Sequence, residues 1–116
     1  MPRGPGATCD LMELKKLVEI VMEQAREKGF GTKPEEVDIP EKIALIHSEL
    51  SEALEAYRYK KIDGKDGMKE ELSDALQRLL HLCGILGIDI EEEVLKKIES
   101  NRDRKWDWKE MNETHC

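Results

Sequence analysis

The chain has 116 residues, of which 39% are charged and only 4% aromatic, and its formal net charge is −7 at pH 7. This length suits one domain with a single small core. The negative charge excludes a broad basic surface for duplex nucleic acid or for an anionic membrane. Since strands favour aromatic and β-branched residues, the low aromatic content argues against a β-sandwich and for an all-α protein.

Cysteine usage and hydropathy indicate a soluble protein of the reducing cytoplasm. The three cysteines, Cys9, Cys83 and Cys116, are too few and too scattered for a disulfide framework or a thiolate zinc site. No apolar run approaches the ~20 residues that a membrane-spanning helix needs, and residues 1–9 lack the apolar centre of a signal peptide. We therefore expect no membrane partner.

The sequence divides into a flexible N-terminal segment (residues 1–9), a helical domain (residues 10–106) and a polar C-terminal tail (residues 107–116). Hydrophobic periodicity predicts helices over about 10–28, 40–59 and 68–86, followed by a shorter helix that Asp89 caps. Gly29 and Gly87 suit the ends of the first and third helices. Between the first two helices, Phe30 to Asp38 is predicted to be a loop long enough to cover a site.

The second and third helices each carry two rows of residues that we expect to be covered. The main stripe of the second helix is Ile43, Ile46, Leu50, Leu54 and Tyr57, and its second row is Leu45, Glu49, Glu52 and Ala56. The main stripe of the third is Met68, Leu72, Ala75, Leu76, Leu79, Cys83 and Leu86, and its second row is Glu71, Asp74, Arg78 and Ile85. We expect an antiparallel bundle of about four helices, whose second rows pack against another copy of the chain.

Two matched acid pairs mark the candidate site. Glu49 and Glu52 lie three residues apart on the second helix, and Glu71 and Asp74 have the same spacing on the third. An isolated pair of this kind is typical of solvated surface, but these pairs lie beside apolar rows and flank a glycine-rich turn at residues 60–67. Packed together, four carboxylates would repel one another, and Mg²⁺ or Mn²⁺ is the expected compensation.

The spacing E-x-x-E, eighteen residues, E-x-x-D resembles that of the MazG-like all-α nucleoside triphosphate pyrophosphohydrolases. The likeness extends over roughly residues 28–106. It includes K-G-F at 28–30, E-K-I-A-L-I-H-S-E-L-S-E-A-L-E-A-Y-R at 41–58, E-E-L-S-D-A-L-Q-R-L-L-H-L at 70–82, L-G-I-D-I-E at 86–91 and K-I-E-S-N-R-D-R at 97–104. Two departures are Gly31, where related sequences often have Trp, and the absence of H-G after the final arginine. We expect base recognition or lid closure to differ accordingly.

The resemblance implies Mg²⁺-dependent cleavage of a nucleoside triphosphate between its α and β phosphates. It also implies a homodimer or homotetramer that completes the site between subunits. Carried over by position, the metal-binding acids would be Glu49, Glu52, Glu71 and Asp74. The ending K-x-x-x-N-x-x-R would place Lys97, Asn101 and Arg104 on the phosphates or sugar.

Other roles follow from the chemistry of single residues. Glu52 is our choice for the carboxylate that positions or deprotonates the attacking water. Arg78 either neutralises developing charge or pairs with Asp74, and Phe30 is placed to stack on a base. For His47 and His81 we expect structural or surface roles.

Two alternatives stay open from the sequence. One is a related enzyme restricted to dUTP or dCTP, or acting on phosphoribosyl-ATP. The other is a helical regulatory module that binds a nucleotide or a metal without turnover.

Overall fold

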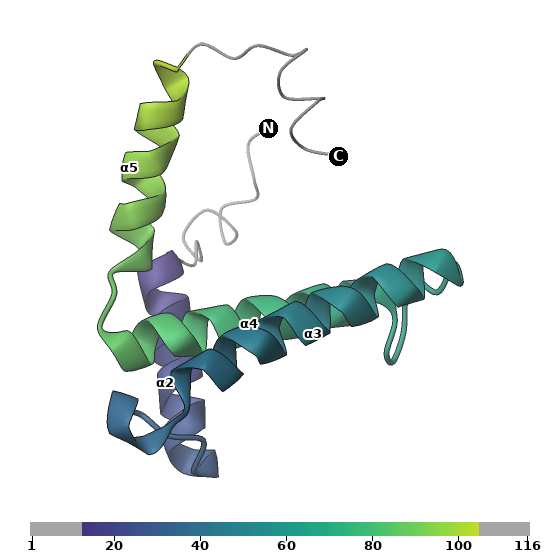
Figure 1. The fold of residues 1–116 in the computed structure, drawn as a ribbon, viewed down its shortest axis with the longest axis horizontal. Helices are drawn as coiled ribbons and strands as arrows, with labels where there is room; N and C mark the ends of the chain where they lie inside the picture. Colours follow the sequence, from purple (N-terminus) through teal and green to yellow (C-terminus); the bar gives the residue numbers. More distant parts are fainter. Residues whose placement is uncertain (1–12, 105–116) are drawn as a thin grey trace, which may run out of the picture.

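The fold is taken from a computed structural model that describes residues 13–104 (Figure 1). Its elements are α2 (Leu14–Lys28), the short 3-10 helix η1 (Pro34–Glu36), α3 (Ile39–Arg58), α4 (Met68–Leu86) and α5 (Ile90–Arg102). The described range contains no strand, which confirms the all-α class. No helix in this range combines the length and apolar character needed to cross a membrane. The expected N-terminal segment and C-terminal tail lie outside the described residues.

Local sequence signals explain where the helices begin and end. Gly29 and Gly87 follow α2 and α4 with φ of 75° and 69°, a left-handed conformation that glycine adopts without a steric penalty. Asp89 caps α5 by accepting a hydrogen bond from the backbone N–H three residues on, at 3.1 Å, as predicted. Asp38, assigned to the loop by its sequence context, caps α3 in the same way at 3.1 Å.

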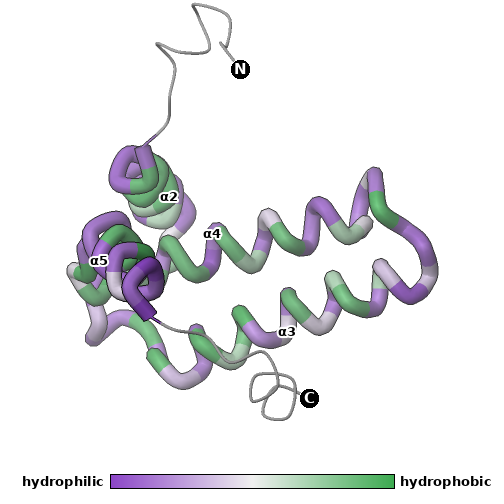
Figure 2. Tube along the Cα trace, turned by 90° about the horizontal axis from the view of Figure 1, so that it is seen from above, coloured by the Kyte–Doolittle hydropathy of each residue, from purple (hydrophilic) through white to green (hydrophobic). Residues whose placement is uncertain are grey.

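Helices α3 and α4 form a long hairpin. The chain turns back at residues 59–67, so that α4 lies alongside α3 (Figures 1 and 2). Helix α2 crosses the hairpin and packs on α4, whereas α5 leaves the end of α4 and extends away from the hairpin (Figure 1). The crossing is close because Gly84 has no side chain, and a Cβ there would overlap the Met22 side chain. This crossing places the loop that follows α2 beside the hairpin.

Small residues line the interior of the hairpin. The buried apolar residues of the described range are Val21, Ala25, Ala53, Ala56, Ala75, Leu80, Leu82, Cys83 and Ile85. The small side chains at the α3–α4 contact are Ala53 and Ala56 on α3 and Ala75 on α4, and they let the two helices approach closely. The carboxylates of Glu49 and Glu71 are buried in the same contact. Most residues of the second rows are therefore buried or half-buried, and Glu52 is the exposed exception.

Most large residues of the main stripes lie on the outer surface of the hairpin, although Ala75 and Cys83 of the stripe on α4 are buried, so the predicted assignment of faces is wrong for these large residues. Leu50, Leu54 and Tyr57 on α3 are 47%, 52% and 60% exposed, and Leu72 and Leu76 on α4 are 42% and 45% exposed. We call these five residues the hairpin's apolar face. Periodicity locates the large apolar side chains around a helix, but it does not say whether the same chain or another one covers them.

Candidate functional site

Three of the four predicted acids converge. Glu49 and Glu52 lie one turn apart on α3, and Glu71 faces them from α4. Each offers a carboxylate oxygen, and the three oxygens lie within 4.8 Å of one another. Glu49 and Glu71 are buried, while Glu52 is exposed to solvent. An all-carboxylate set of this kind fits a hard divalent cation, so the chemistry of these donors agrees with the expected class of metal.

The carboxylates of this acid cluster oppose one another's ionisation. The pKa of Glu52 is raised, first by a hydrogen bond with the Glu49 carboxyl and then by that group's charge. The pKa of Glu71 is raised mainly by burial, and next by the charges of Glu52 and Glu49. The more distant carboxylates of Asp66 and Asp74 add smaller contributions in the same direction. A bound cation would remove this repulsion, because it favours the ionised form of every ligand.

Asp74 stands apart from the acid cluster. It is half-buried on α4, and the group of three mutually close carboxylates does not include it. Together with Glu49 it lines a cavity of about 410 Å³. The predicted quartet is thus divided between three clustered oxygens and one acid on the cavity side, and Glu49 belongs to both.

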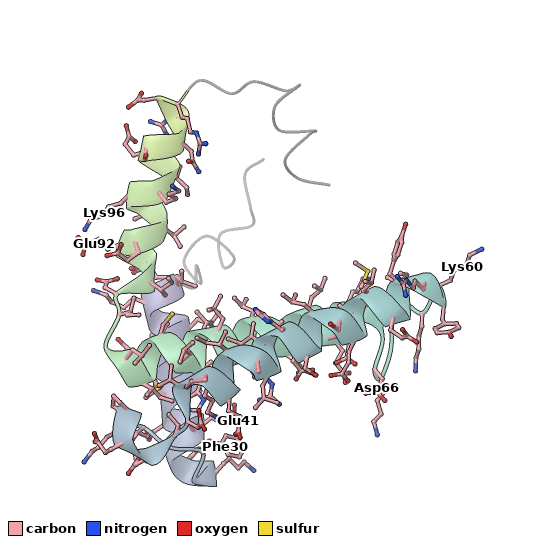
Figure 3. All side chains as sticks on the ribbon, in the orientation of Figure 1. Phe30, Glu41, Lys60, Asp66, Glu92 and Lys96 are labelled. Atoms are coloured by element: carbon pink, nitrogen blue, oxygen red, sulfur yellow. The ribbon has the colours of Figure 1, made fainter. Side chains whose placement is uncertain are left out.

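The cavity lies between α2, α3, α4 and the loop after α2. Its lining residues are Val21, Gln24, Ala25, Phe30, Lys42, Glu49, Asp74, Gln77, Arg78 and His81. The volume falls in the range of about 300–1,000 Å³ that is usual for small-molecule sites. Figure 3 shows Phe30 at the α2 end of the hairpin, far from Lys60 at the opposite end. The α2 side of the wall combines the apolar Val21 and Ala25 with Gln24, and the α4 side is polar throughout. Such a wall suits a ligand with a flat apolar part and a charged part.

Arg78 pairs with Glu49, not with Asp74. Its Nε donates a hydrogen bond of 2.8 Å to Glu49 Oε2, across the hairpin from α4 to α3. Of the two roles considered for Arg78, the neutralisation of developing charge stays a prediction, whereas the pairing with Asp74 within α4 is therefore wrong. The physical reason is that Glu49 is the more buried charge, with a side chain only 12% exposed, and gains more from a cationic partner.

His81 lines the cavity. We expected a structural or surface role for it and did not predict a position at the cavity. It is 7% exposed, and its Nε2–H donates to the backbone oxygen of Gly31 at 2.8 Å. The signal for this position was present in the sequence. Residue 81 lies three positions after Arg78 and seven after Asp74, so it continues the second row of α4.

The predicted nucleotide contacts on α5 do not reach the acid cluster within one chain. Neither Lys97 nor Asn101 on α5, nor Arg104 just beyond it, lines the cavity. Figure 3 shows Glu92 and Lys96 on α5, well away from Asp66 in the hairpin loop.

Comparison with protein-family models, with curated proteins and with solved structures finds no match for this chain. The likeness to the MazG-like family therefore stays a prediction that rests on the sequence motifs. The convergence of three carboxylates beside a cavity is an observation separate from those motifs.

Proposed function

We propose that this protein is a Mg²⁺-dependent nucleoside triphosphate pyrophosphohydrolase, with Mn²⁺ as a possible substitute. It would convert an NTP or dNTP into the nucleoside monophosphate and pyrophosphate. The observation that carries the proposal is the acid cluster: three carboxylates from two helices lie within 4.8 Å of one another, and one of them, Glu49, also lines a 410 Å³ cavity. The resemblance in the motifs supplies the reaction.

The charges of the site support this choice. A triphosphate carries several negative charges and cannot approach carboxylates unless cations lie between them. Glu49, Glu52 and Glu71 would hold the metal, which when bound supplies Lewis acidity and lowers the pKa of a coordinated water. Lys42 and Arg78, on the cavity wall, offer positive charge to phosphate oxygens.

Glu52 is the residue to which we assign proton transfer. It is the one carboxylate of the cluster that is exposed to solvent, so a water molecule can reach it. In the reaction the water oxygen bonds to the α phosphorus, the bond from that phosphorus to the α–β bridging oxygen breaks, and pyrophosphate leaves. Glu52 accepts the proton that the water loses.

We also propose that a second copy of the chain covers the hairpin's apolar face, in a homodimer or homotetramer. Five large side chains there, each more than two-fifths exposed, form a larger apolar surface than isolated monomers usually leave in water. In such an assembly Lys97, Asn101 and Arg104 would meet the site from a neighbouring subunit, in agreement with their distance from it within one chain.

The test is pyrophosphate release from a full panel of ribo- and deoxyribonucleotides, with and without Mg²⁺. Glu52→Gln keeps the size of the side chain and should lower the rate about 100-fold or more. Glu27→Gln makes the same charge change at an exposed position of α2 and should leave the rate unchanged.

The pattern of release separates the alternatives. Release from dUTP, dCTP or phosphoribosyl-ATP alone would narrow the substrate to that compound. If a folded, metal-binding protein releases pyrophosphate from none of them, the proposal fails and a non-catalytic binding module takes its place.

A further inference from the structure

We infer that His81 is a positioning residue. Through its hydrogen bond to Gly31 it holds Phe30 as one wall of the cavity, and this cavity takes the nucleoside end of the substrate. The inference rests on the proposed function for the identity of the ligand. It goes beyond that function in assigning how the nucleoside is held and which residue, remote from the acids, controls its affinity.

The first argument is the continuity of the cavity with the acid cluster. Glu49 contributes an oxygen to the cluster and also lines the cavity, so the cluster meets the cavity at Glu49. Glu52 and Glu71 line a separate pocket of about 260 Å³. A ligand whose phosphates lie at Glu49 can extend its other end into the cavity. There the α2 side offers Val21 and Ala25, and Phe30 closes the same wall, a surface that suits the face of a base.

The second argument is that the backbone of Phe30 is fixed on both sides. Its own N–H donates to the backbone oxygen of Ala25 at 2.9 Å, and the next carbonyl, that of Gly31, accepts from His81 at 2.8 Å. A carbonyl oxygen can only accept, so Nε2 of His81 carries the hydrogen. Because His81 is buried on α4, this bond ties the loop rigidly to the hairpin.

The third argument is that this turn requires glycine. Gly31 has φ of 98°, which side-chain-bearing residues rarely adopt, and a Cβ there would lie 2.7 Å from Val37 Cγ1. The carbonyl of residue 31 therefore has a set direction, toward His81. A turn built in this way holds a side chain that is itself 57% exposed, Phe30, at the cavity. Within the single chain most of the Phe30 side chain stays uncovered, so its face at the cavity is available to a ligand.

The test separates the nucleoside from the phosphates. Uncharged nucleosides are titrated without divalent metal, with ligand-observed NMR as the readout, and inorganic tripolyphosphate is titrated with Mg²⁺ by calorimetry. His81→Leu removes the donor, and His81→Gln keeps an N–H at a similar reach. Phe30→Leu removes the aromatic face at an exposed position and is not expected to unfold the protein.

We expect His81→Leu and Phe30→Leu to weaken nucleoside binding about tenfold, since stacking of one base on an aromatic side chain contributes on this order. The affinity of both variants for tripolyphosphate should stay within about twofold of the wild-type value. His81→Gln should bind nucleosides almost as tightly as the wild type does. In turnover assays the KM for the nucleotide should rise more than kcat falls.

Several outcomes overturn the inference. They are absence of nucleoside binding by the wild type at millimolar concentration, equal losses for nucleoside and tripolyphosphate, and unchanged nucleoside affinity in Phe30→Leu. Nucleoside binding needs no turnover, so its presence together with no pyrophosphate release would overturn only the proposed function. Pyrophosphate release with a KM that neither His81→Leu nor Phe30→Leu changes would overturn the inference and leave the proposed function standing.

Discussion

Arg78 on α4 donates a hydrogen bond of 2.8 Å to Glu49 on α3, and this pair divides the acid cluster into two kinds of carboxylate. Glu49 has a cationic partner and is nearly buried. Glu52 and Glu71 have raised pKa values, for which mutual repulsion is one cause. The charge of the cluster is thus only partly balanced by the protein itself.

Removal of the Arg78 guanidinium should destabilise the protein. Arg78→Ala leaves the Glu49 carboxylate without its partner, and we expect the free energy of unfolding to fall by about 1–3 kcal/mol, as for other hydrogen bonds to charged groups. Urea denaturation monitored by circular dichroism measures the change. In the double variant Arg78→Ala/Glu49→Gln the loss should be smaller than the sum of the two single losses. Strictly additive losses would contradict the pairing.

The acid cluster should make the stability of the metal-free protein fall as pH rises. The folded-state pKa values of Glu52 and Glu71 are raised, so these carboxyls bind more protons in the folded than in the unfolded state. This difference begins at a pH near the ordinary carboxyl pKa of 4.5 and extends up to a pH above the folded-state pKa. In that window the unfolded state loses its protons first, so their contribution to stability decreases with increasing pH. Thermal melts between pH 4.5 and 8 should show a larger increase in Tm on adding Mg²⁺ at the alkaline end.

The same reasoning predicts that Glu52→Gln stabilises the metal-free protein at neutral pH. The substitution removes one of the mutually repelling charges, so its Tm should exceed that of the wild type, while the response to Mg²⁺ should largely disappear. Glu27→Gln on α2 is the matched control and should retain the full response to Mg²⁺. A lower Tm for Glu52→Gln, or an undiminished response to Mg²⁺, would argue against the acid cluster as a metal site.

Gly67→Ala should strain the hairpin loop. A Cβ at residue 67 would lie 2.6 Å from the backbone oxygen of Asp63 and 2.9 Å from that of Ile62, and backbone atoms cannot rotate away as a side chain can. We expect the free energy of unfolding to fall by about 1–3 kcal/mol, which is typical of overpacking. Lys65→Ala, at an exposed position of the same loop, should change the free energy of unfolding by less than about 0.5 kcal/mol. Equal effects in chemical denaturation would show that the loop accommodates the added methyl group.

A charge on the hairpin's apolar face should prevent self-association. Leu54 is 52% exposed in the single chain, so Leu54→Glu should leave the monomer folded while opposing the burial of this face. Sedimentation velocity should give a dimer or tetramer for the wild type and a monomer for the variant. Ile20→Glu on α2, a residue 45% exposed outside this face, is the control. A monomeric wild type at tens of micromolar would refute the proposed assembly.

Local sequence signals predicted the helices well. The range of α4, 68–86, agrees at both ends, and Gly29, Gly87 and Asp89 end or begin helices as expected. These features depend on residues within one turn of each other, so a single sequence contains them. The convergence of Glu49, Glu52 and Glu71 was predictable for a related reason, because it needs only helical spacing and a hairpin.

Features that depend on contacts distant in sequence were not predictable in this way. The hydrogen bond from His81 to Gly31 joins residues fifty positions apart, and nothing in either neighbourhood encodes it. The partner of Arg78 depends on which carboxylate is more deeply buried, a property of the packed hairpin. The inward face of α3 was misassigned because alanines such as Ala53 and Ala56 give a weaker periodic signal than leucines, although they permit the closer approach.

Gly84 lies outside the cavity, at the crossing of two helices that both line it. Helix α2 supplies Val21 and Ala25 to the cavity, and α4 supplies Asp74, Arg78 and His81. A Cβ at residue 84 would overlap the Met22 side chain, so any larger residue there has to displace Met22. The packing of α2 on α4 can therefore be altered from a position that contributes nothing to the cavity lining.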